Sequence, residues 1–155
     1  TATTRYGLYG LNFNIATPVK LGQAQGRYSF NFRGQYTPDI LYGSDQFSIG
    51  GRYTVRGFDG EQTLSAENGF IIRNELSVPF KKIRLEPYLG LDIGHVWGPS
   101  DEYLLGKNLA GAVFGIRGSL WQGMQYDAFI GAPLYKPAGF KTSKTALGFQ
   151  VYYQF

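Results

Sequence analysis

One arginine stands out among the residues that could carry chemistry. Arg56 lies in "GGRYTVRGFDGEQ", residues 50–62, where glycines flank it and the strand-like alternation of the neighbouring segments stops. Its planar guanidinium can bind a carboxylate through two parallel hydrogen bonds, and Gly57 beside it permits a tight turn of the backbone. The chemistry offered by this stretch is therefore anchoring through an ion pair. The alternative is an ordinary solvated loop arginine.

Other candidate chemistry finds little support in the sequence. The sole histidine, His95, falls on the apolar side of its segment, which favours an interfacial position over a role as ligand or base. The chain has no cysteine and no Ser/His/Asp set with a plausible base, so we predict no enzyme, no metal and no cofactor. The spacing of the carboxylates in the long central connection matches no calcium loop: Asp39, Asp45, Asp59, Glu61 and Glu67.

The net charge of +4 is scattered along the chain, without a run of Lys or Arg. A nucleic-acid partner requires clustered positive charge, so we expect none.

Apolar and polar residues alternate with a period of two along most of the chain. In the closing "TALGFQVYYQF" the odd positions from 147 on are Leu, Phe, Val or Tyr, and the even ones are mostly Gly or Gln. Segments of this kind run for ten or more residues, which is longer than usual for globular proteins and is what a tilted strand needs to cross a bilayer. We predict seven strands, at about 5–15, 27–37, 69–79, 83–97, 109–121, 124–132 and 145–155.

The connections alternate in length, which is typical of outer-membrane barrels. The predicted connections are a turn at 16–26, a long excursion at 38–68, a tight turn near "VPFKKI", a loop at 98–108, a tight turn at "WQGM" and a loop at 133–144. The long excursion then lies on the extracellular side and Phe155 on the periplasmic side. Aromatic residues near strand ends predict a membrane girdle: Tyr6, Tyr28, Trp97, Trp121 and Tyr153.

A soluble β-sandwich or lipocalin-like barrel also has alternating strands. Its polar face would be rich in Lys and Glu, whereas here that face holds Gly, Ser, Asn, Gln, Arg and Tyr, as a crowded lumen does. We therefore predict an all-β fold, a transmembrane antiparallel β-barrel of outer-membrane type. Bacterial barrels have even strand numbers, so seven strands indicate one missed strand or, as we favour, an incomplete barrel. The strand-like opening "TATTRYGLYG" also favours a piece of a longer chain.

The stretch "IGGRYTVRGFDGEQTLSAENGFIIRNELSVPF" resembles the two-partner secretion outer-membrane transporters, the haemolysin-activator and haemagglutinin-exporter family. Its "GGRYTVRGF" and "ENGFIIRNEL" segments, with "GLDIG" downstream, carry the likeness. The resemblance covers about Tyr6 to Phe155 and implies that residues 1–155 are the C-terminal half of a sixteen-stranded barrel. The plug helix, the two POTRA domains and the first barrel half of that family would lie outside this sequence.

The resemblance implies that loop 38–68 folds into the lumen, where Arg56 meets Asp92. Val55, Gly57 and Phe58 complete the loop motif, and Gly90 and Gly94 flank Asp92 in the wall motif. Strand parity independently puts Asp92 on the polar face. Asp92 could instead pair with another lumen arginine, such as Arg84 or Arg117. The charges predicted to line the lumen are Arg33, Arg73, Glu75, Arg84, Glu86, Arg117 and Asp127.

The function that the resemblance implies is translocation of an unfolded partner exoprotein, of haemolysin or adhesin type, across the bacterial outer membrane. The strands would contact outer-membrane lipid, and the aromatic terminus Phe155 would be read by the barrel assembly machinery. Two alternatives remain: a barrel-insertion factor of the same superfamily and a passive porin-like channel.

Overall fold

The protein folds as one long antiparallel sheet with a small hairpin beside it. The computed structural model describes residues 7–41, 45–51, 54–101, 104–121 and 123–153, apart from the side chain of Trp121. Within these residues the large sheet has the strand order β1-β2-β5-β6-β7-β8-β9, and β3 pairs with β4. The strands are β1 (Tyr9–Leu21), β2 (Ala24–Tyr36), β3 (Phe47–Ile49), β4 (Leu64–Ala66), β5 (Asn68–Ser77), β6 (Leu85–Trp97), β7 (Asn108–Trp121), β8 (Met124–Tyr135) and β9 (Ala146–Tyr153).

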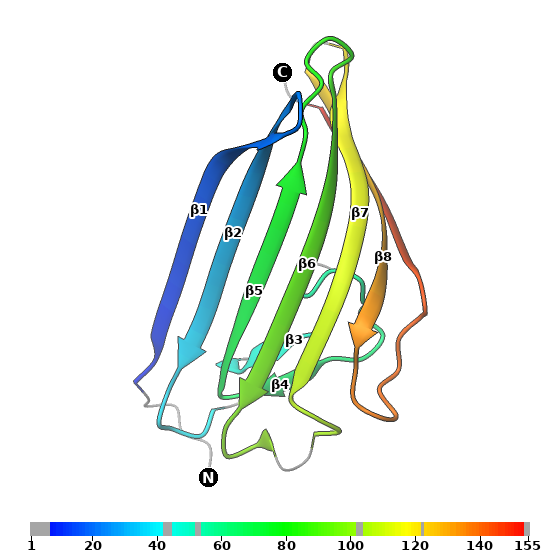
Figure 1. Ribbon diagram of the computed structural model, residues 1–155. Coiled ribbons are helices and arrows are strands. Elements are labelled where there is room, and N and C mark those ends of the chain that lie inside the picture. The colour runs from blue at the N-terminus through cyan, green and yellow to red at the C-terminus, as the bar shows by residue number, and fades with distance from the viewer. Residues whose placement is uncertain (1–6, 42–44, 52–53, 102–103, 122, 154–155) are drawn as a thin grey trace.

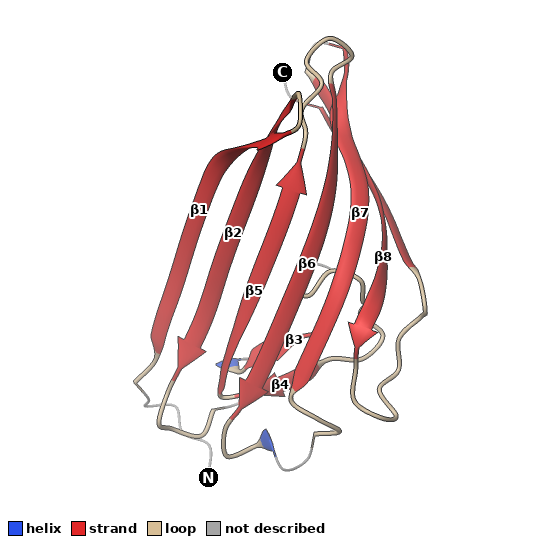
Figure 2. Ribbon diagram, viewed as in Figure 1, coloured by secondary structure: helices blue, strands red, loops and turns tan. Residues whose placement is uncertain are grey.

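The large sheet curves like part of a barrel wall, and the β3–β4 hairpin lies on its concave side (Figure 1). Short turns gather at the end of the sheet where the chain finishes, and longer loops gather at the opposite end (Figure 2). The all-β, outer-membrane-type fold predicted from the sequence is confirmed as a partial barrel. No helix among the described residues is long and apolar enough to cross a membrane.

The two faces of the sheet are those of a membrane barrel. On β6, Leu89, Leu91 and Ile93 are 53%, 51% and 47% exposed on the convex face. The residues that alternate with them, Gly90, Asp92 and Gly94, are buried on the concave face. Large apolar side chains that point outward over a whole sheet would be unfavourable in water but match the hydrocarbon of a bilayer. The convex face therefore has the apolar surface expected of a side that faces lipid.

Aromatic residues lie at both rims of the convex face. Near the short-turn end, the Tyr28 hydroxyl donates a hydrogen bond to Asn74 Oδ1. At the opposite rim the Trp97 and His95 rings stack, and Phe70 packs edge-on against Trp97. His95 thus lies among aromatic rings near the end of β6, and its position at the membrane interface stays a prediction. Tyr6, Phe155 and the side chain of Trp121 lie outside the described residues.

The apolar core lies on the concave side, between the long loop and the wall. Loop residues Val55 and Phe58 are buried there beside the hairpin. The wall contributes Ile71, Val96 and Leu109 to the same cluster. The long excursion is therefore a packed element on the concave side of the sheet, near the long-loop end.

Three predictions of local structure were wrong. The turn predicted at 16–26 is much shorter, because β1 continues to Leu21 and β2 begins at Ala24 after a tight turn in which Gly22 has a φ of 65°. Loop 38–68 contains the β3–β4 hairpin, which the sequence analysis did not anticipate. Arg84 is not a strand residue, since it lies in the β5–β6 turn before Leu85. Its φ of 53° is incompatible with a strand.

Candidate functional site

The tip of the long loop is shaped by a tight turn before the arginine. Thr54 N donates to Gly51 O at 3.2 Å, and Gly50 N donates to Thr54 Oγ1 at 3.1 Å. This turn directs the chain against the wall, where Val55 and Phe58 are buried in the core on either side of Arg56. Val55 and Phe58 fix the backbone of the loop tip, and the Arg56 side chain between them extends to β6.

The structure places Arg56 on Asp92 in a bidentate arrangement. Arg56 Nε lies 2.7 Å from Asp92 Oδ2, and Arg56 Nη2 lies 2.9 Å from Asp92 Oδ1. The backbone N–H of Arg56 also donates to Asp92 Oδ2, at 2.9 Å. The Asp92 side chain is fully buried and that of Arg56 is 11% exposed. Paired, charge-assisted bonds of this geometry fix both position and orientation.

Two further arginines complete the charge balance around this pair. Arg56 Nη1 donates to Glu75 Oε1 at 2.7 Å, and Arg117 donates to both oxygens of Glu75 at 2.8 and 3.0 Å. Arg73, directly opposite Asp92 in the sheet, lies 3.6 Å from its carboxylate. Of the alternative partners named for Asp92, Arg117 binds Glu75 and Arg84 lies in the β5–β6 turn, whereas Arg73 is a second cation beside Asp92.

The remaining predicted lumen charges also lie on the concave face. Arg117 stacks over the Tyr88 ring at 4.0 Å, and the Tyr88 hydroxyl donates to Asp127 Oδ1 at 2.7 Å. Glu86 accepts a hydrogen bond from Arg27 at 3.3 Å. Arg33 lies over the ring of Phe47 in the hairpin, 5.4 Å from its centroid. A mixed-charge strip thus runs from the loop tip toward the short-turn end.

The wall glycines make the socket that receives the loop. A Cβ at Gly90 would lie 2.6 Å from Arg56 Nη2, and one at Gly94 would lie 2.7 Å from Val55 Cγ2. A Cβ at Gly111, on the next strand, would lie 2.0 Å from the carbonyl oxygen of Arg56. Gly57 has a φ of 111° and approaches Ala132 O so closely that a side chain would not fit. Gly90 and Gly94 therefore leave room for the side chains of Arg56 and Val55, and Asp92 between them binds the guanidinium.

The segment after the loop motif is tied to the β8–β9 loop, a contact that the sequence analysis missed. Phe58 packs edge-on against Phe140, with ring centroids 5.8 Å apart. Asp59 accepts hydrogen bonds from Ser143 N at 2.9 Å and from Thr142 Oγ1 at 3.1 Å. The pKa of Asp59 is lowered to about 2, mainly by a hydrogen bond from the backbone N–H of Glu61. Burial acts in the opposite direction, and the hydrogen bonds from Ser143 and Thr142 lower the pKa further.

Glu67 is a second structural residue that the sequence analysis did not single out. Its side chain is fully buried, and it accepts hydrogen bonds from Ser100 N at 3.0 Å, Ser100 Oγ at 2.7 Å and Leu41 N at 3.3 Å. Burial opposes ionisation, but these hydrogen bonds outweigh it and hold the pKa of Glu67 below its ordinary value. Glu67 therefore joins the long loop to the β6–β7 loop. Its partners are too distant in sequence for any local pattern to reveal them.

This constellation is suited to fixing a loop inside a barrel. Its charged groups are saturated by one another, and no group of three or more His, Cys, Asp or Glu within the described ranges could hold a metal ion. A family model described as haemolysin secretion/activation protein ShlB/FhaC/HecB matches residues 1–118. The chain belongs to this family. The resemblance recognised from the loop and wall motifs is confirmed.

The family relatives are outer-membrane transporters. Over 156 residues the chain is 47% identical to the outer membrane transporter CdiB-2 of Burkholderia pseudomallei (strain 1026b), covering 99% of the chain and 27% of the relative. It is 36% identical over 85 residues to the hemolysin transporter protein ShlB of Serratia marcescens, covering 54% of the chain and 15% of the relative. Like these members, the chain is part of an outer-membrane protein, and the family is one of transporters and not of enzymes.

Solved structures agree with this assignment. CdiB from Acinetobacter baumannii superposes with a TM-score of 0.89 at 35% identity, covering 97% of the chain and 27% of that structure. CdiB from Escherichia coli has the same fold, with a TM-score of 0.87 at 24% identity over 98% of the chain and 28% of that structure. The chain spans about a quarter of the length of these relatives.

Proposed function

We propose that the protein containing this chain exports an unfolded partner exoprotein through the outer membrane by two-partner secretion. The chain forms the C-terminal part of the pore wall, and its loop 38–68 occupies the lumen. The observation that carries this proposal is the bidentate bond between Arg56 and Asp92, which holds the loop tip inside a barrel wall of the haemolysin secretion family.

The lumen chemistry supports passage of an unfolded chain. The concave face alternates cations and carboxylates from Asp92 to Arg27, and the long loop covers the apolar cluster of Ile71, Val96 and Leu109. Such a surface wets a polypeptide without binding it hydrophobically. A wide barrel also needs something in its lumen to prevent leakage, and the packed loop fills part of that space.

Membership of the haemolysin secretion family favours export over the two alternatives, barrel insertion and passive diffusion. The convex apolar face would contact outer-membrane lipid. Phe155 would serve as the aromatic signal for the assembly machinery, and the exported partner would be of haemolysin or adhesin type.

The test is a secretion assay with Arg56→Ala, Asp92→Ala and the double variant in the full-length protein. The strands close without the loop, so the barrel should reach the outer membrane at normal levels. Export should fall about tenfold or more in each single variant, because a lost interaction of about 1.4 kcal/mol already changes a population tenfold. The double variant should be little worse, since both changes remove the same contact.

Lys144→Ala, which removes an exposed cation from the β8–β9 loop, is the matched control and should export normally. Full export by Arg56→Ala would show that the pair does not hold a functional loop. The same conclusion would follow if the fold-reduction in export of the double variant equalled the product of the two single reductions.

A further inference from the structure

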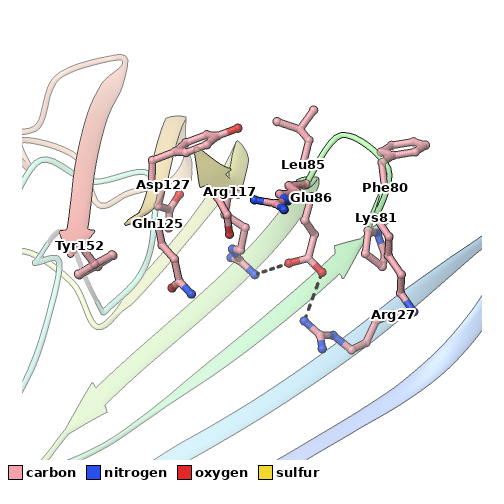
Figure 3. Close-up of a pocket in the computed structure, with 14 residues that line it drawn as sticks. Arg27, Phe80, Lys81, Leu85, Glu86, Arg117, Gln125, Asp127 and Tyr152 are labelled. Carbon is pink, nitrogen blue, oxygen red and sulfur yellow. Dashed lines mark hydrogen bonds and ion pairs between the residues drawn. The ribbon is translucent and has the colours of Figure 1, made fainter. Parts of the chain in front are cut away.

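A cavity of about 670 Å³ opens at the short-turn end of the sheet, away from the loop anchor. Side chains from β2, β6, β7, β8 and β9 and from the β5–β6 turn converge on it (Figure 3). Short turns mark the periplasmic end of an outer-membrane barrel. The cavity therefore lies at the mouth through which a chain bound for the cell surface enters.

The lining of this cavity carries more positive than negative charge. Its cations are Arg27, Lys81, Arg84 and Arg117, and its anions are Glu86 and Asp127. Glu86 is shared, since it lies 3.3 Å from Arg27 and 3.7 Å from Arg117. Dashed lines in Figure 3 mark both contacts. Lys81 and Arg84 make no ion pair within the part of the chain that the structure describes. Two exposed cations are thus available to a ligand.

The β5–β6 turn that presents these two cations is held rigidly. Phe80 and Leu85 exchange backbone hydrogen bonds of 2.8 and 3.2 Å across it, and Ser119 N on β7 donates to Arg84 O at 3.1 Å. Arg84 has a φ of 53°, the only non-glycine value in the left-handed region among the described residues. A Cβ at Gly118 would lie 2.2 Å from Arg84 O, so the wall leaves space for this backbone. Strained backbone of this kind persists where its surroundings fix it, often at binding sites.

We propose that this cavity binds acidic side chains of the exported polypeptide as it enters the lumen. The inference rests on the proposed export function and adds the chemistry of the segment that is recognised. Lys81 and Arg84 would attract a carboxylate, while Phe80 and Tyr152 offer ring surfaces to its neighbours. Glu86, shared between Arg27 and Arg117, reduces the positive potential of the cavity, so a bound carboxylate dissociates quickly. Because the attraction is between exposed charges, it weakens as salt is added.

The first test measures peptide binding to the purified full-length transporter in zwitterionic lipid nanodiscs. Two fluorescein-labelled peptides of equal length are compared by anisotropy: one with Asp and Glu at alternate positions, and one with Asn and Gln in their place. The acidic peptide should bind at least about tenfold more tightly, and the preference should decline with salt. Lys81→Gln with Arg84→Gln should abolish the preference, and Lys81→Gln alone should reduce it.

Lys20→Gln, which removes an exposed cation near the same end of β1 but outside the cavity, is the matched control and should retain the preference. Equal affinity of the two peptides, or a preference unchanged in the double variant, would overturn the proposal.

The second test identifies the occupant in cells. A photo-crosslinking benzoylphenylalanine replaces Phe80 in the full-length transporter while its partner exoprotein is stalled during export. The expected product joins the transporter to the exoprotein. Crosslinks confined to the transporter itself or to lipid would assign the cavity to those occupants and overturn the proposal. Peptide binding is measured without secretion, so its failure beside normal Arg56-dependent export would refute the cavity alone and leave the export function standing.

Discussion

At the scale of the residue, the charge balance explains why a carboxylate can be fully buried in the wall. Asp92 accepts hydrogen bonds from the side chain and the backbone of Arg56, and Arg73 lies beside it. Removing one member of a buried ion pair typically costs about 3–5 kcal/mol, because the other is left uncompensated. Losing either partner of this pair is therefore far more costly than losing one member of an exposed salt bridge.

A prediction at this scale concerns the space in the wall. Gly111→Ala would place a Cβ 2.0 Å from the carbonyl oxygen of Arg56, and neither backbone can move far without breaking the sheet or the Asp92 bond. We expect a loss of about 1–3 kcal/mol in loop packing and a marked fall in export. Thermal unfolding and secretion of the full-length protein would measure the two effects.

Gly10→Ala is the matched control, because the nearest atom to its Cβ is Gly34 O at 3.9 Å. If Gly111→Ala and Gly10→Ala had the same stability and export, the socket would be looser than the contacts indicate.

At the scale of the element, the long loop behaves as a small folded unit. Its hairpin, its buried Val55 and Phe58, and its hydrogen bonds to two other loops give it a core of its own against the wall. The Arg56 clamp thus acts together with attachments farther along the loop. One of these attachments depends on pH.

Acid should weaken the link between the long loop and the β8–β9 loop. The pKa of Asp59 is lowered from 3.8 to about 2, so its contribution to stability is complete above pH 3.8 and is lost as the pH falls toward 2. Hydrogen exchange of segment 136–145, normalised to the unfolded peptide at each pH, should therefore quicken between pH 4 and pH 2.

Asp59→Asn should already show the faster exchange at pH 4 and lose the pH dependence. Glu61→Gln keeps the backbone N–H that Asp59 accepts and should behave as the unmodified protein. Identical pH profiles for Asp59→Asn and the unmodified protein would rule out this link.

The sequence predicted the wall far better than the loops, for physical reasons. Alternation of side chains is a local property, so it revealed seven long strands and the inward face of Asp92. The turn expected at 16–26 was too long, because β1 pairs with β2 through Pro18 up to Leu21, a cross-strand contact that side-chain alternation alone does not report. The β3–β4 hairpin and the contacts of Glu67 join residues far apart in sequence, and no periodic pattern reports them.

At the scale of the whole molecule, the sheet has open edges. β1 pairs only with β2, and β9 only with β8, among the described residues. Long unpaired edges cannot persist in hydrocarbon, where each free backbone group is costly. Further strands must therefore continue the barrel on both sides, which agrees with a chain that covers 27% of its relative.

The assignment of the two faces leads to a prediction for the edge strand β9. Single cysteines are introduced into a cysteine-free full-length protein in native outer membranes. Leu147, Phe149 and Val151 are 66%, 69% and 47% exposed on the convex face, so cysteines there should react with a lipophilic maleimide. Cysteines at Gln150 and Tyr152 should react with a charged, water-soluble thiosulfonate, because the register turns those positions toward the concave face.

Gly148 is omitted from this scan, since a Cβ there would lie 2.1 Å from Phe129 Cζ and would disturb the strand. Because successive side chains of a strand point to opposite faces, the two reagents should label alternate positions. Labelling of neighbouring positions by the same reagent would mean that β9 does not separate lipid from lumen. The lumen assignment of Asp127, which lies opposite Gln150, would then fail with it.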